Sequence, residues 1–149
     1  MRARSRARGW AVQVLYAWEA HGRSDSPVDV LAEFLRERRI AETSREYLDQ
    51  LIRRIAEHRR EIDGLLQDAL TNWRLERLSA IDRNILRIAT AEMLFLRDVP
   101  ARVSIQEAIV LAEKYGTGES PRFVNGVLDA VMHRLEQRPG RSAGRREGS

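Results

Sequence analysis

Apolar residues recur along the chain at intervals of three and four positions, the spacing of helices that bury one face. No segment alternates strictly between apolar and polar residues, as a half-buried strand would. We therefore predict an all-α fold of about seven helices. Their approximate ranges are 5–21, 26–35, 43–55, 62–70, 79–96, 104–115 and 120–135, with a kink near Arg60 between the third and fourth.

Two kinds of signal mark the predicted helix starts. Serine followed by proline at the first helical position occurs twice, and the Ser/Thr-x-x-Glu spacing of a capping box also occurs twice. Gly22 and Gly116 are expected to end the first and sixth helices. The four starts are Ser26 with Pro27, Ser120 with Pro121, Thr43 with Glu46, and Ser104 with Glu107.

The predicted fifth helix has an unusually wide apolar face made of two neighbouring stripes. Such a face indicates a central helix that packs against partners on two sides. The first stripe is Ile81, Ile85 and Ile88, and the second is Leu86, Ala89, Met93 and Leu96.

Charge divides the chain into three parts. The net charge is +4, but residues 1–8 carry four arginines and no acid, and residues 138–149 carry four arginines and one glutamate, which leaves 9–137 mildly acidic. We expect an arginine-rich arm at 1–8, a helical domain at 9–137, and a disordered basic tail at 138–149, where nothing apolar can be buried. Basic ends on an acidic body favour a polyanionic partner.

Little in the sequence points to catalysis. There is no cysteine, and the three histidines lack the spacing of metal ligands. No nucleophile–base grouping or paired carboxylates emerge, so we expect a protein that is not an enzyme and uses no metal or cofactor. No apolar run approaches the roughly 20 residues needed to cross a bilayer. We expect a cytoplasmic protein without a membrane partner.

The N-terminal arginines suggest RNA. On a helix, Arg2 and Arg6 form one stripe, and Arg4 and Arg8 form another about 200° away, so one face cannot present all four. A frayed or extended arm that orders on binding would engage all four with phosphates, a mode common in RNA recognition. No recognition-helix pattern for DNA is seen.

Two aromatic residues near arginine segments can be read in two ways. Tyr16 in the first helix and Phe123, beside Arg122, would stack unpaired bases if they were exposed. Their positions next to apolar stripes equally suit core residues.

Four runs of sequence fall in order over most of residues 4–135. They are Arg6 to Tyr16, Ile81 to Ala89, Val99 to Ala108, and the Phe-Val-Asn-Gly-Val-Leu-Asp run from Phe123 to Asp129. In these runs the sequence resembles the NusB family, and their order makes coincidence a poor explanation.

The resemblance implies two packed helical bundles that bind single-stranded boxA RNA of ribosomal RNA leader transcripts. It implies action with NusE, a small-subunit ribosomal protein, in an RNA polymerase antitermination complex, and it allows a homodimer. Glu76 and Asp82 would face NusE. The RNA side would comprise Arg4, Arg6, Arg8, Tyr16, Glu119, Arg122 and Phe123. The alternatives are a helical domain of the kind found in RNA cytosine methyltransferases and a scaffold that binds only proteins.

Overall fold

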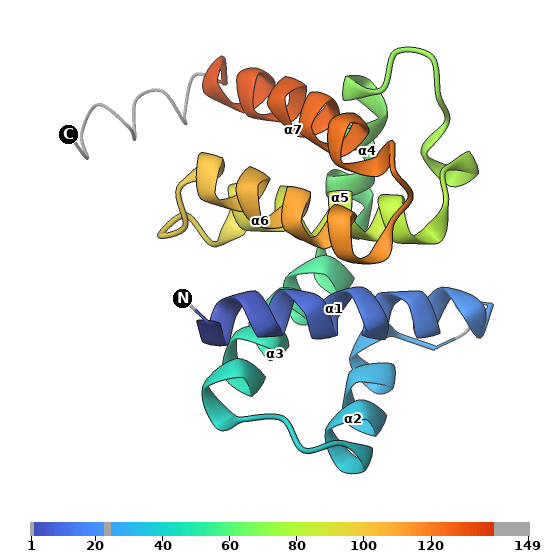
Figure 1. Cartoon of the computed structure of the whole chain (residues 1–149), viewed down its shortest axis with the longest axis vertical. Helices are drawn as coiled ribbons and strands as arrows, with labels where there is room; N and C mark the ends of the chain where they lie inside the picture. The colour runs from blue at the N-terminus through green and yellow to red at the C-terminus, as the bar shows by residue number, and fades with distance from the viewer. Residues whose placement is uncertain (1, 23–24, 139–149) are drawn as a thin grey trace.

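A computed structural model describes residues 2–22 and 25–138, and every regular element in these ranges is helical (Figure 1). The predicted all-α fold is confirmed. The helices are α1 (Arg2–Ala20), α2 (Pro27–Glu37), α3 (Glu42–Glu57), α4 (Arg59–Ala69), the short 3-10 helix η1 (Leu75–Arg77), α5 (Ala80–Phe95), α6 (Ala101–Tyr115) and α7 (Ser120–Glu136).

The helices form two packed groups, with α1 to α3 in one half of the molecule and α4 to α7 in the other (Figure 1). His58 ends α3 and precedes α4, so the expected kink lies two residues before Arg60. Helix α5 contacts α1 and α3 in one group and α4, α6 and α7 in the other. Every residue from 83 to 93 is buried, which confirms the prediction of a central helix.

Two serine caps form at helix starts as their chemistry predicts. The Ser26 hydroxyl accepts a hydrogen bond from the Val28 amide, the Asp29 carboxylate accepts one from the Ser26 amide, and Pro27 opens α2. Ser79 caps α5 by accepting from the Asp82 amide at 3.1 Å. Both helix starts are therefore fixed by local bonding.

Both predicted capping boxes are wrong. Helix α3 begins at Glu42, before Thr43, and Ala41 precedes it without a side-chain cap. Helix α6 begins at Ala101, directly after Pro100, so Ser104 lies within the helix. The Ser104 hydroxyl donates to a buried glutamate of α5, and this tertiary contact replaces the local one that its spacing suggested.

As predicted, a glycine follows the end of α1 and the end of α6. Gly22 adopts φ 81°, the left-handed conformation that glycine tolerates best, just after α1. Gly116 follows α6, and its amide bonds to the Ala112 carbonyl. None of the described helices is both long and apolar enough to span a membrane.

The chain ends differ from the predicted division. Residues 2–8 are the first two turns of α1, so the structure does not show the arm that we expected at 1–8. Its arginines belong to this helix. Arg138 ends the described chain, with its guanidinium 3.8 Å from Glu61, and the rest of the predicted tail lies outside the described residues.

Candidate functional site

The four N-terminal arginines have three different environments. Arg2 and Arg6 are exposed on one side of α1. Arg4 is partly covered: its Nη2 lies 3.0 Å from Asp98 Oδ2, and its guanidinium lies 4.7 Å from the ring centre of Tyr47. Arg8 is only 2% exposed. The predicted RNA contact at Arg8 is therefore incompatible with its place in the fold.

Arg8 belongs to a buried ion-pair network that joins four helices. Its Nε donates to Glu92 Oε2 at 2.7 Å, and its Nη1 lies 3.1 Å from Glu107 Oε1. The fully buried Glu92 carboxylate also accepts hydrogen bonds from the Tyr47 hydroxyl and from Ser104 Oγ. This network fastens the first turns of α1 to α3, α5 and α6.

The pKa values of two groups in this network, Arg8 and Tyr47, are raised. Burial lowers the pKa of the Arg8 guanidinium, but the charge and hydrogen bond of Glu92 outweigh it and raise the pKa above its ordinary value. Burial raises the pKa of the Tyr47 hydroxyl, and its hydrogen bond to Glu92 raises it further. Tyr47 therefore stays a neutral donor, and Arg8 stays charged.

A groove of about 730 Å³ lies where α5 and α7 begin. It brings together four residues that the resemblance singled out: Asp82 of α5, Glu119 before α7, and Arg122 and Phe123 in its first turn. Glu119 and Arg122 are exposed, and Phe123 is half-buried. The remaining lining residues are Trp73, Arg77, Leu78, Ser79, Thr117, Gly118 and Ser120.

Tyr16 lies outside this groove, in a smaller hollow of about 290 Å³ that it shares with Gln13, Ile81 and Tyr115. Half of its surface is exposed, which excludes the reading as a core residue. A third hollow of about 380 Å³ contains Arg6 and shares Gln13 and Tyr115 with that of Tyr16. Ile81 of the Tyr16 hollow precedes Asp82 of the groove in the chain, but this hollow and the groove share no lining residue.

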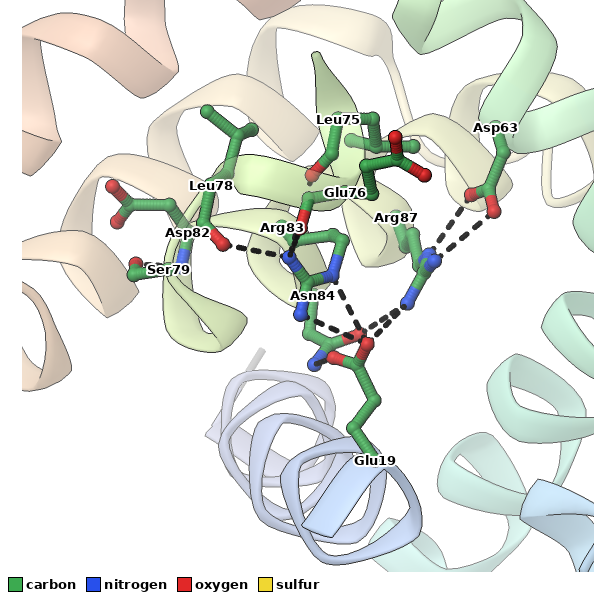
Figure 2. A network of polar contacts seen from close by, with 10 residues as sticks. All are labelled: Glu19, Asp63, Leu75, Glu76, Leu78, Ser79, Asp82, Arg83, Asn84 and Arg87. Atoms are coloured by element: carbon green, nitrogen blue, oxygen red, sulfur yellow. Dashed lines mark hydrogen bonds and ion pairs between the residues drawn. The ribbon is translucent and has the colours of Figure 1, made fainter. Parts of the chain in front are cut away.

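Figure 2 shows the polar contacts around Glu76 and Asp82, the two residues predicted to face a protein partner. Arg83 of α5 donates through Nη1 to the Leu78 carbonyl at 2.6 Å and, with longer bonds, to those of Leu75 and Glu76 in η1. Its Nε and Nη2 reach Glu19 Oε2 of α1 at 3.0 and 2.9 Å. One guanidinium thus fixes the η1 turn relative to α1.

Two more α5 side chains complete this network. Asn84 donates to Glu19 Oε1 at 2.6 Å, and Arg87 binds both oxygens of Asp63 in α4, at 2.8 and 3.0 Å. Burial raises the pKa of Glu19, but hydrogen bonds from Arg83 and Asn84 outweigh it, and the net effect lowers the pKa. Glu19 is therefore an anion, and side chains of α5 bind both of its carboxylate oxygens.

Of the two acids predicted to face a protein partner, Asp82 lines the groove and Glu76 does not. Glu76 is exposed on η1, and its Oε1 lies 2.9 Å from Arg74 Nη2. Asp82 is half-buried, and its amide is used in the Ser79 cap. The structure therefore places the two acids at either end of the short segment that Arg83 holds.

Sequence reasoning missed Trp73 and Arg77. Trp73 is 60% exposed, the most exposed of the large hydrophobic side chains in the described ranges, and both residues line the groove. The available signal was a bulky aromatic residue in the polar stretch Thr71 to Arg74, outside any apolar stripe.

The described residues hold no group of three or more His, Cys, Asp or Glu side chains arranged to bind a metal ion. What the surface does present is exposed arginine, exposed aromatic rings and a groove between helix starts. Fold and surface together define an all-helical protein built to bind other macromolecules.

Comparison with known proteins gives the family. The profile of the NusB family matches residues 5–133. The transcription antitermination protein NusB of Sorangium cellulosum is 43% identical over 135 residues, covering 91% of this chain and 95% of the relative. The chain belongs to the NusB family, as the sequence motifs predicted, and this is a family of non-enzymatic proteins.

Solved structures agree. A T. maritima NusB structure is 39% identical, with a TM-score of 0.81 over 87% of this chain and 90% of its own. A crystal structure of the antitermination factors NusB and NusE in complex with double-stranded RNA is 30% identical, with a TM-score of 0.80 over 90% and 98% of the two chains. The two-bundle arrangement is therefore that of the family.

Proposed function

We propose that this protein is a transcription antitermination factor that binds single-stranded boxA RNA of ribosomal RNA leader transcripts together with NusE, within an RNA polymerase complex. The observation that carries the proposal is a set of three hollows lined by Arg6, by Tyr16 and by the Arg122–Phe123 corner, the first two of which share Gln13 and Tyr115. Cations for phosphates and aromatic rings for unpaired bases are what single-stranded RNA requires. Relatives that match over nearly their whole length carry this name.

The NusE side is proposed for the η1 turn and the start of α5. Glu76 is exposed there, Asp82 lies at the groove edge, and Arg83 holds the intervening segment in place. A basic surface on the partner would complement these acids. The RNA and protein partners would then meet at the groove, where Asp82 lies beside Arg122 and Phe123.

The test is fluorescence anisotropy with a labelled boxA RNA and a scrambled RNA of equal length, with and without NusE. Arg2, Arg6 and Arg122 are the exposed arginines among the residues predicted to bind RNA, so these three should contribute about 2 to the magnitude of the log–log salt slope, at roughly 0.7 per phosphate contact. The double variant Arg2→Gln/Arg6→Gln should lower this slope by about 1.4.

The matched control is Arg36→Gln/Arg39→Gln, which removes two exposed charges at the end of α2 and just beyond it. It should leave the slope nearly unchanged. Equal affinity for boxA and scrambled RNA, with and without NusE, would contradict the proposal. Absence of RNA binding with intact NusE binding would instead identify a protein-only scaffold. Sedimentation velocity on the free protein checks for a homodimer that would compete with RNA for the same residues.

A further inference from the structure

Trp73 is presented on a braced loop. The Gln67 side chain of α4 donates to the Trp73 carbonyl at 2.9 Å and accepts from the Leu75 amide at 2.9 Å, so it bonds to the chain on both sides of Arg74. The indole nevertheless leaves 60% of its surface in solvent and lines the groove. An ordered backbone that exposes a large aromatic ring is a ready stacking surface, because little freedom is lost when a partner covers it.

The groove also offers positive charge. Arg77 and Arg122 line it, both are exposed, and neither forms an ion pair within the described ranges. Helices α5 and α7 both begin at the groove, and each contributes roughly half a positive charge at its N-terminus. These charges together exceed those of Asp82 and Glu119, so the groove suits an anionic ligand.

We propose that the groove takes an unpaired RNA base stacked on Trp73, with Arg77 and Arg122 on the neighbouring phosphates. The inference rests on the proposed RNA-binding function and adds Trp73 and Arg77, which the resemblance does not assign. The volume of about 730 Å³ falls within the range of small-molecule pockets, about 300–1,000 Å³. The Asp82 and Glu119 carboxylates are acceptors for the amino group of a base.

RNA is the occupant that the surroundings favour. Arg122 and Phe123, which were predicted to bind RNA, line the groove together with Trp73 and Arg77. A protein side chain would use the same indole but would gain nothing from Arg77 and Arg122 unless it were acidic.

The experiment measures the affinity of boxA RNA, without NusE, for Trp73→Ala, Trp73→Phe and Arg77→Gln. Trp73→Ala should weaken binding roughly 5- to 150-fold, the range that corresponds to losing about 1–3 kcal/mol of base–aromatic stacking, and Trp73→Phe should restore most of it. Arg77→Gln should lower the salt slope by about 0.7. Arg39→Gln, an exposed arginine outside the groove, is the matched control and should match the wild type.

Abasic RNAs separate stacking from a general loss of affinity. In a series of boxA RNAs, each with one base removed, a single position should cost the wild type as much as Trp73→Ala does and should cost Trp73→Ala almost nothing further. Equal losses for both proteins at every position would overturn the inference. Because the indole is largely exposed, thermal melting should show the same fold and midpoint for each variant.

Three further outcomes are decisive. If Trp73→Ala binds RNA as tightly as wild type while Arg2→Gln/Arg6→Gln and Arg122→Gln bind more weakly, the inference fails and the proposed function stands. If none of these variants weakens binding, the RNA-binding function itself fails. If Trp73→Ala weakens only NusE binding, the indole is a protein contact and the inference is overturned.

Discussion

Arg8 provides the sharpest test of how the α1 arginines divide their roles. Arg8→Met keeps an apolar side chain in place but leaves the fully buried Glu92 carboxylate without its cation. Breaking a buried pair in this way typically costs about 3–5 kcal/mol. Hydrogen bonds from Tyr47 and Ser104 remain, so we expect the lower end, about 3 kcal/mol or roughly 10 °C in melting temperature.

The assay is urea unfolding followed by circular dichroism, with Arg6→Met as the control. Arg6 is exposed and forms no ion pair within the described ranges, so its loss should change the free energy of unfolding by less than about 0.5 kcal/mol. Arg8→Met/Glu92→Gln should cost less than Arg8→Met alone, because Glu92 no longer leaves a buried charge without its cation, and the amide oxygen still accepts one of the two hydroxyls while its NH2 group can donate to the oxygen of the other. Equal unfolding midpoints for Arg8→Met and Arg6→Met would refute the reasoning.

Four further predictions concern stability. The lowered pKa of Glu19 means that its stabilising contribution is present above its ordinary pKa and is lost as the pH falls through the lowered value; the difference in urea midpoint between wild type and Glu19→Gln should therefore shrink below about pH 4. Gly126→Ala should raise the free energy of unfolding by about 0.5–1 kcal/mol, because an added Cβ in this helix meets nothing within 4 Å. Gly22→Ala, at φ 81°, should lower it by about 1 kcal/mol in thermal melts; a gain there would contradict the backbone argument. Arg83→Gln should cost about 3 kcal/mol and shift the tryptophan emission, because the η1 turn beside Trp73 loses its guanidinium; an unchanged spectrum would show that η1 is held without it.

Most of the fold could be predicted because its signals are local. The stripes of α5 and the cap at Ser26 depend on neighbours within a few residues, and both are confirmed. Ser104 misled the prediction because its hydroxyl serves Glu92 on another helix rather than its own backbone. A serine that is predicted to cap a helix forms the cap only when its hydroxyl does not bond to another helix instead.

The candidate site was less predictable for the same reason. Arg8 looks like its neighbours in sequence, but its partners Glu92 and Glu107 are 84 and 99 positions away. Nothing in the local pattern shows that one arginine of the series is internal. Trp73 was missed because it belongs to no periodic face, and only the fold shows that it lines one groove with the start of α7.

The anchoring of α1 has a thermodynamic consequence. An arm that folds on contact loses conformational entropy at that moment, whereas α1 already holds Arg2 and Arg6 one turn apart, about 6 Å along the axis. RNA association should therefore lack the signature of coupled folding: little gain in helical ellipticity and a small heat-capacity change. The conformational entropy of ordering α1 is already lost when the protein folds. Arg8 anchors the helix through its buried ion pair with Glu92 and is not exposed to contact RNA.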